Sequence, residues 1–176
     1  MPGRWFQNPP PGYGGAVDVA ALARQAVKNM ALVGPAIGIA PKVGGKSAVG
    51  LPVWLWDTVT PTTWGPNTAT AAAGGVTVTA TGSATQIVWS MGDGSTVTCN
   101  GPGTAYQPSF GDQAPDCGHT YSVTSAAQPG GTYAITATAT WVVNWTANTG
   151  QQGTITVTRQ SATTAVIGEL QVLNTQ

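Results

Sequence analysis

The stretch APKVGGKS, from Ala40 to Ser47, has residues of the types and spacing that bind nucleotide phosphates. It fits the relaxed phosphate-loop pattern [AG]-x-x-x-x-G-K-[ST] through Ala40, Gly45, Lys46 and Ser47. In such a loop, backbone N–H groups cradle the phosphates, the Lys neutralises charge and the hydroxyl binds Mg²⁺. The apolar run VWLWD follows and ends in Asp57, the position of a magnesium-binding carboxylate at a strand end.

The elements needed to position that site are missing from the sequence. A phosphate loop requires a helix that begins at the Lys, but the next residues are SAVGLPVW. Gly50 and Pro52 fall in the first turns of that helix, where Pro costs about 3 kcal/mol. Too few residues separate Ser47 from Asp57 for a helix and a crossover, which need about a dozen. We therefore interpret Ala40–Ser47 as a flexible connector and expect no cofactor.

The only histidine, His119, is the second candidate for chemistry. A catalytic role would pair it with Ser90, Asp93 or Asp116. A calcium site would instead gather Asp93, Asp112 and Asp116, because Ca²⁺ binds several oxygen ligands. Asp in a Gly-Asp-Gly stretch is more often a turn former, and His-Thr-Tyr is more often a structural corner. We expect no catalytic residue and no metal ion, and predict that the chain is not an enzyme.

Composition excludes several classes of partner. Charged residues make up 7% of the chain against about 25% in an average soluble domain, and the net charge is zero. Such a chain has no electrostatic surface for nucleic acid or anionic membrane. No apolar run reaches the roughly 18 residues of a membrane span, and no signal peptide is visible. The two cysteines, Cys99 and Cys117, predict one disulfide and a secreted or cell-surface protein.

The first part of the chain is predicted to be an extension, residues 1–50. It is rich in Pro and Gly and contains one amphipathic helix at about residues 17–31, where apolar residues recur at helical spacing. Residues 32–50 read as loop. Residues 51–176 then form the β domain.

Alternating patterns predict the strands of that domain. Three segments have side chains that alternate in type from one residue to the next: VWLWD, GVTVTATG and TQIVWSM. The longest alternating run, residues 132–146, keeps a period of two throughout. A returning strand begins near Ile155 and Val157, and the segment AVIGELQVL closes the sequence. Short strands with Gly-rich turns predict an all-β antiparallel sandwich.

Two motifs carry a family resemblance. They are WSMGDG, Trp89 to Gly94, and CGHTYS, Cys117 to Ser122, followed by GGTYAITATATW. Their order and spacing over residues 68–175 resemble the PKD domain, an immunoglobulin-like sandwich named for polycystic kidney disease proteins. More loosely, residues 17–175 are similar to a group of secreted actinobacterial proteins of unknown function, some of them labelled ATP/GTP-binding.

The resemblance implies structural roles for the motif residues. Trp89 would fill the core between the sheets, and Asp93 with Gly94 would form a hairpin turn. His119 would belong to the corner, and Tyr121 would act as a tyrosine corner bonded back to the backbone. The long loop between the cysteines and the extra hairpin after the long strand depart from the family pattern.

The sequence leaves three hypotheses for function. The first is a non-catalytic extracellular interaction, adhesion or spacer module that binds an unknown protein or cell-wall polysaccharide. The second is a carbohydrate-binding module that stacks sugars on exposed tryptophans, with two same-face pairs as candidates: Trp54, Trp56, Trp141 and Trp145. The third is a homo-oligomer, a surface fibre in which residues 32–56 add a strand to the exposed sheet edge of a neighbour.

Overall fold

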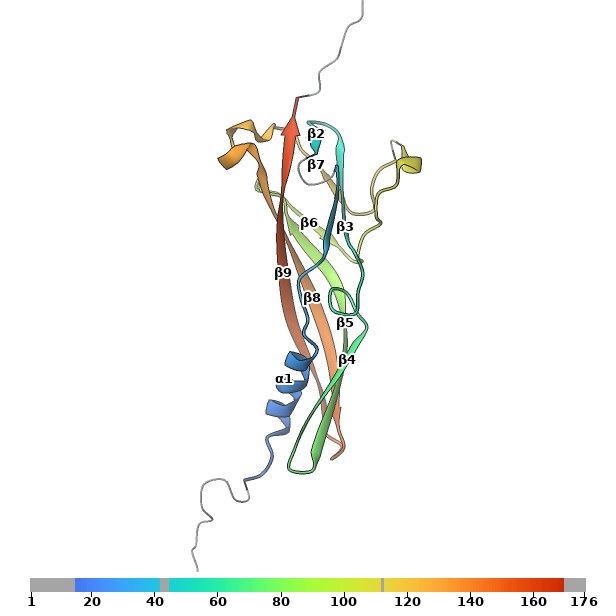
Figure 1. Ribbon diagram of the computed structural model, residues 1–176, viewed down its shortest axis with the longest axis vertical. Coiled ribbons are helices and arrows are strands. Elements are labelled where there is room, and N and C mark those ends of the chain that lie inside the picture. The colour runs from blue at the N-terminus through green and yellow to red at the C-terminus, as the bar shows by residue number, and fades with distance from the viewer. Residues whose placement is uncertain (1–14, 42–44, 112, 170–176) are drawn as a thin grey trace, which may run out of the picture.

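The computed structural model describes residues 15–41, 45–111 and 113–169. The molecule is elongated, and two β-sheets pack on each other as a sandwich-like fold (Figure 1). One α-helix lies beside the sheets in the described part of the chain. The predicted all-β class is therefore confirmed.

The larger sheet has six strands in the order β2-β9-β8-β5-β4, with β6 paired to β5 beyond the end of β4. Its strands are β2 (Lys46–Ala48), β4 (Asn67–Ala73), β5 (Val76–Ser90), β6 (Thr96–Cys99), β8 (Tyr133–Ala147) and β9 (Gln152–Gly168). The sequence period of two sends the apolar side chains of β5 and β8 inward and leaves a threonine-rich outer face. Three strands of 15 or 17 residues make this sheet unusually long.

The smaller sheet covers only part of the larger one. It consists of β1 (Ile37–Ala40), β3 (Pro52–Asp57) and β7 (Gly118–Thr120) in the order β1-β3-β7, and it lies over the upper half (Figure 1). Helix α1 (Val19–Asn29) lies over the lower half, mainly against β4 and β5. Three short 3-10 helices occur in the loops: η1 (Pro108–Phe110), η2 (Ser125–Ala127) and η3 (Pro129–Gly131).

The helix forms where its sequence predicts. Asp18 caps it by accepting a hydrogen bond from the Ala21 backbone N–H, at 3.0 Å. Ala23, Ala26 and Val27 are buried, so the apolar face of the helix is part of the core. The prediction of a helix at about residues 17–31 is confirmed to within two residues at each end.

Two segments that were predicted as separate strands form one continuous strand. The patterns GVTVTATG and TQIVWSM belong to the continuous strand β5, whose pairing with β8 shifts register between Ala84 and Gln86. This bulge inserts one extra residue, so Ala84 and Ile87 face the same side although an odd number of positions separates them. Trp89 is consequently fully buried, in the core position implied by the resemblance.

The prediction of a loop over residues 32–50 is wrong. β1 pairs antiparallel with β3, and β2 pairs parallel with β9. Strands of four and three residues are too short to give a periodic signal, and their pairing depends on distant partners. The boundary predicted at residue 50 does not separate two units, because α1, β1 and β2 pack into the same core. β1 and β2 pair within their own chain, each at the edge of its sheet, so strand addition from residues 32–56 to a neighbour stays a prediction.

The predicted disulfide is confirmed. Cys99 ends β6 and Cys117 precedes β7, and their Cα atoms lie 5.8 Å apart. Because β6 belongs to the larger sheet and β7 to the smaller one, the bond joins the two layers at the upper end. It also closes the long loop of residues 100–116.

Removing this bond tests how much the layers depend on it. We expect Cys99→Ala with Cys117→Ala to lower the free energy of unfolding by about 3 kcal/mol, because the loop is no longer closed in the unfolded chain. Urea denaturation measures the loss. Reductant should destabilise the wild type by a similar amount and leave the double variant unchanged; an equal response of both proteins would refute this account.

Candidate functional site

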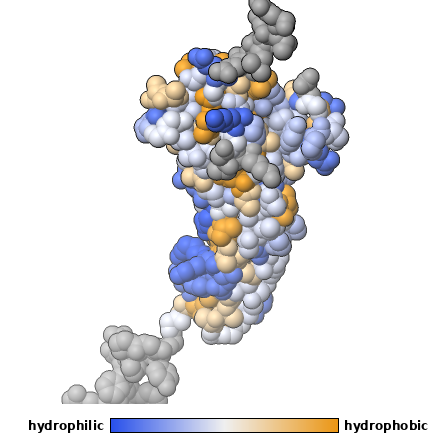
Figure 2. All heavy atoms as spheres, turned by 45° about the horizontal axis from the view of Figure 1, so that its top comes forward, coloured by the Kyte–Doolittle hydropathy of each residue, from blue (hydrophilic) through white to orange (hydrophobic). Residues whose placement is uncertain are grey.

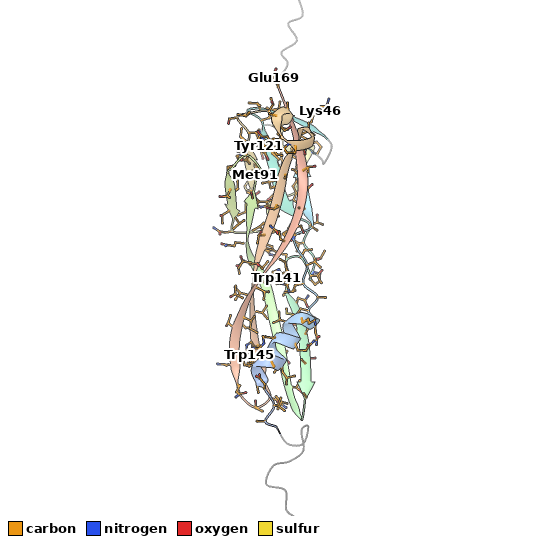
Figure 3. The ribbon with its side chains drawn as sticks, turned by 90° about the vertical axis from the view of Figure 1, so that its left-hand side faces the viewer. Lys46, Met91, Tyr121, Trp141, Trp145 and Glu169 are labelled. Carbon is orange, nitrogen blue, oxygen red and sulfur yellow. A yellow bond between two sulfur atoms is a disulfide. The ribbon has the colours of Figure 1, made fainter. Side chains whose placement is uncertain are left out.

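The described residues of the phosphate-loop stretch, 40, 41 and 45–47, are not arranged as in a phosphate loop, and residues 42–44 lie outside the described residues. Lys46 and Ser47 lie in strand β2, where a loop of this kind would begin a helix. Neighbours in a strand point to opposite sides, so Lys46 is exposed while Ser47 is buried (Figure 3). The two side chains therefore cannot reach the same phosphate and magnesium ion. The interpretation as a connector is also incomplete, since residues 46–48 are a paired strand.

Asp57 has a structural role. Its side chain is only 3% exposed, and Oδ1 accepts a hydrogen bond from the Ala36 backbone N–H at 2.7 Å. Burial raises the pKa of Asp57, although the bond from Ala36 opposes the shift. The carboxylate thus holds the start of β1 against the end of β3, away from Lys46 and Ser47 in sequence and in sheet.

The two family motifs meet at His119. Asp93 lies in the turn after β5, where Gly94 has a φ of 89°, as the predicted hairpin turn requires. His119 Nε2 lies 2.8 Å from Asp93 Oδ2 and 3.3 Å from Ser95 Oγ. Ser95 also donates both its backbone N–H and its hydroxyl to Asp93 Oδ1. The cluster joins β7 of the smaller sheet to the β5–β6 turn of the larger sheet.

This cluster lacks the geometry of a serine–histidine–aspartate triad. In a triad, the carboxylate and the hydroxyl bond to opposite nitrogens of the imidazole. Here both groups contact Nε2, and the hydroxyl of Ser95 is already bonded to the carboxylate. The ring therefore cannot take a proton from the hydroxyl at one nitrogen while a carboxylate orients it through the other nitrogen.

Tyr121 continues the cluster into the core. Its ring stacks on Tyr133 at 4.5 Å between centroids and meets the edge of the His119 ring at 4.6 Å. Its hydroxyl donates to the Met91 carbonyl at 2.8 Å, and Figure 3 places Tyr121 and Met91 together in the upper half. Burial raises the pKa of Tyr121 far above its usual value. The predicted tyrosine corner, which bonds to nearby backbone, is therefore not formed, and the hydroxyl of Tyr121 instead joins the segment after β7 to the end of β5.

Two of the three aspartates considered as possible calcium ligands, Asp93 and Asp116, have separate partners. Asp93 is bonded to His119 and Ser95, whereas Asp116 accepts bonds from the backbone N–H and the hydroxyl of Thr104. Asp112 lies outside the described residues. Within those residues, no group of three or more His, Cys, Asp or Glu side chains gathers in a way that would hold a metal ion.

Neither of the two predicted tryptophan rows is exposed along its whole length. Trp54 and Trp141 are buried, at 6% and 0% exposure. Trp56 and Trp145 are half-buried, and each indole lies across a glycine of the neighbouring strand, Gly38 for Trp56 and Gly153 for Trp145. A Cβ at either glycine would collide with the indole, so these tryptophans fill space that the glycines leave. The hypothesis that the tryptophans form exposed rows is therefore wrong for Trp54 and Trp141.

One aromatic pocket does open at the upper end of the molecule. Trp54 stacks on Phe110 at 5.3 Å between centroids and meets the ring of Tyr106 edge-on at 5.5 Å. The cavity beside them has a volume of about 450 Å³, and Leu51 and Pro52 contribute to its apolar walls. Charged side chains are absent from its described lining. The site suits a neutral ligand with an apolar face.

Sequence reasoning missed Ser95, Tyr106 and Phe110. The Asp93-Gly94-Ser95 order did carry a signal, because Asp side chains commonly bond to the backbone two residues onward. Tyr106 and Phe110 lie in a loop without periodic pattern, so nothing in the sequence indicated that they cover Trp54.

Comparison with known proteins finds no matching family model, no matching curated protein and no matching solved structure. The resemblance to the PKD domain therefore stays a prediction, supported by the motifs alone.

The Asp93–His119 pair predicts a pH-dependent stability. Burial alone would raise the pKa of Asp93, but the bonds from Ser95 and His119 outweigh it and hold that pKa below its usual value. A depressed carboxyl pKa stabilises the fold above the unfolded pKa, and the contribution disappears as pH falls below about 4. We expect Asp93→Asn to cost about 1 kcal/mol at pH 7 and progressively less as the pH falls below about 4, measured by urea denaturation. Parallel curves for the two proteins at all pH values would show that the charge is irrelevant.

Proposed function

We propose that this chain is a non-catalytic extracellular spacer that presents an interaction surface at one end. The observation that carries the proposal is the position of the described chain ends. Gly15 precedes α1 at the lower end of the long axis, and Glu169 follows β9 at the upper end (Figures 1 and 3). β9 alone, with 17 residues, extends over about 55 Å.

The strand pairing suits a load along this axis. β9 is bonded to β8 from Gln152 to Ala165, and β8 is bonded to β5 over most of its length. A force between the chain ends runs nearly parallel to these strands. It therefore loads many backbone hydrogen bonds together, whereas a force across the strands breaks them one after another.

Other features fit an extracellular setting. The disulfide between Cys99 and Cys117 is typical of an oxidising compartment, and the surface relies on Thr, Ser and Gln in place of charge. In the part of the chain that the structure covers, no helix has the length and apolar character needed to cross a membrane.

The spacer proposal predicts anisotropic mechanical strength. With tethers at Gly15 and Glu169, we expect unfolding at a clearly higher force than with tethers at Ala73 and Thr149, which lie at the turn ends of β4 and β8. The first pair loads the sheet along the strands, and the second pulls the β4–β5 hairpin away from the β8–β9 hairpin, across the bonds between β5 and β8. Single-molecule force spectroscopy on the oxidised protein compares the two. The proposal would be contradicted if the unfolding force with the first pair of tethers were equal to or lower than the force with the second pair.

A second candidate function is binding of a neutral saccharide in the pocket beside Trp54. The pocket and its partly exposed Tyr106, at 37% exposure, make this a better candidate site for a saccharide than the tryptophan rows. An aromatic ring at the mouth of an apolar pocket can stack on the apolar face of a sugar ring.

The saccharide candidate makes its own prediction. Pull-down on insoluble neutral polysaccharides should detect binding, and Tyr106→Ala should weaken it by about tenfold, as expected for loss of one stacked ring. Val123→Ala is the matched control, because Val123 is an exposed apolar residue of the loop after β7, outside the described lining of the pocket. Equal binding by the two variants would place any saccharide site elsewhere.

A further inference from the structure

The lower half of the larger sheet is only partly covered. Helix α1 packs mainly on β4 and β5 and makes few contacts with β8. Ile155 and Val157, on the inward face of β9, are consequently only half-buried, although they pack against the core. An apolar surface is therefore left between the helix and β9.

A groove of about 330 Å³ lies between α1 and β9 at this place. Its floor is apolar and combines Val27 and Leu32, which are nearly fully buried, with Ile155 and Val157. This volume is at the lower end of the range for small-molecule sites, which is about 300 to 1,000 Å³. The groove therefore has room for one short chain and not for a folded partner.

The segment that follows the helix closes the upper end of the groove. The Leu32 carbonyl accepts a hydrogen bond from Arg159 Nε at 2.9 Å. Gly34 lies so close to β9 that a Cβ at this position would collide with the Gln160 backbone. A ligand chain that lies on Ile155 and Val157 consequently ends at Arg159.

Three cationic side chains line the same groove, Arg24, Lys28 and Arg159, which are half of the six Lys and Arg residues of the chain. None of the described lining residues is acidic. Within the described part of the chain, Lys28 and Arg159 have no carboxylate at ion-pair distance, and Arg24 has only Asp18, at 4.0 Å. Figure 2 shows strongly hydrophilic side chains beside apolar ones in the lower half of the molecule. The groove is therefore positively charged although the chain as a whole is neutral.

Arg159 is already oriented for an anion. It is half-buried and lies on the same face of β9 as Ile155 and Val157. The backbone carbonyls of Leu32 and Thr158 hold its guanidinium through Nε and Nη1, at 2.9 and 2.8 Å. Among the described residues, Nη2 donates no hydrogen bond. A partly buried Arg is usually paired, and the guanidinium matches the geometry of a carboxylate.

We propose that this groove binds a free single-chain carboxylate of the medium-chain fatty acid class. The alkyl chain lies on Val27, Ile155 and Val157, and the carboxylate binds the guanidinium of Arg159. Arg24 and Lys28 add positive charge from the helix side of the groove. This binding goes beyond the spacer function and does not depend on it, because a rod separates its ends with or without a ligand.

Calorimetric titration of the full, oxidised chain with monomeric sodium decanoate tests the proposal. We expect a Kd of about 1 mM or tighter. Hexanoate, whose chain is shorter, should bind at least about tenfold more weakly, because less apolar area is buried. 1-Decanol has the same chain without the charge and should also bind about tenfold more weakly. Added salt should weaken the binding of decanoate and leave that of decanol unchanged. Equal affinities for decanoate and decanol would overturn the proposal.

Variants of the cationic residues test which charges bind the carboxylate. Arg159→Gln should weaken decanoate binding by about tenfold. Because Arg159 also bonds to Leu32, Arg24→Gln with Lys28→Gln is a second variant, in which both changed side chains are exposed on the helix. It should weaken binding by a similar factor without disturbing the fold. Lys46→Gln is the matched control, since it removes one exposed charge on β2 at the other end and should leave the affinity unchanged. Wild-type affinity in both groove variants, or an equal loss in the control, would contradict the assignment.

The location of binding distinguishes the groove from the pocket beside Trp54 and from a membrane surface. In backbone amide NMR spectra, decanoate should shift the signals of α1 and of β9 around Ile155 and Val157. Vesicles of anionic phospholipid should not sediment the protein. Shifts confined to the residues around Trp54 and Tyr106, or capture by vesicles without binding of monomeric decanoate, would each overturn the proposal.

Discussion

The structure depends on a mismatch in strand length between its two layers. β5, β8 and β9 run for 15 to 17 residues, whereas the strands that face them run for three to six. The inner face of a sheet this long carries apolar side chains along its whole length and must be covered. Two different elements share the task, the smaller sheet above and the helix below. The elongated shape and the groove beside β9 both follow from that division.

The upper half is held together by side chains from distant parts of the sequence. The disulfide, the Asp93–His119 pair and the bond from Tyr121 to the Met91 carbonyl all connect β7 with the end of β5 or with β6. β7 has only three residues, so its few backbone bonds to β3 would hold it weakly. The Asp93–His119 pair is therefore one of three cross-links that hold β7 in place.

Glycine and tryptophan have paired roles in this sheet. Trp56 lies over Gly38, and Trp145 lies over Gly153, so each glycine gains the packing that its missing side chain does not supply. Neither Trp56 nor Trp145 consequently presents its whole indole to solvent. The small pocket around Trp54 and Tyr106 is both aromatic and open, and it is formed by strand β3 and a loop.

The sequence by itself determined the elements with a strong period, the turn at Gly94 and the pairing of its two cysteines. The first two depend on neighbouring residues, and two cysteines allow only one pairing. It indicated neither β1 and β2 nor the burial of Trp54 and Trp141, since these depend on which distant strand lies alongside. The tertiary structure alone decided that the second layer covers half of the sheet. That outcome rests on the packing of α1 against β4 and β5, which leaves the inward side chains of lower β9 only half-buried.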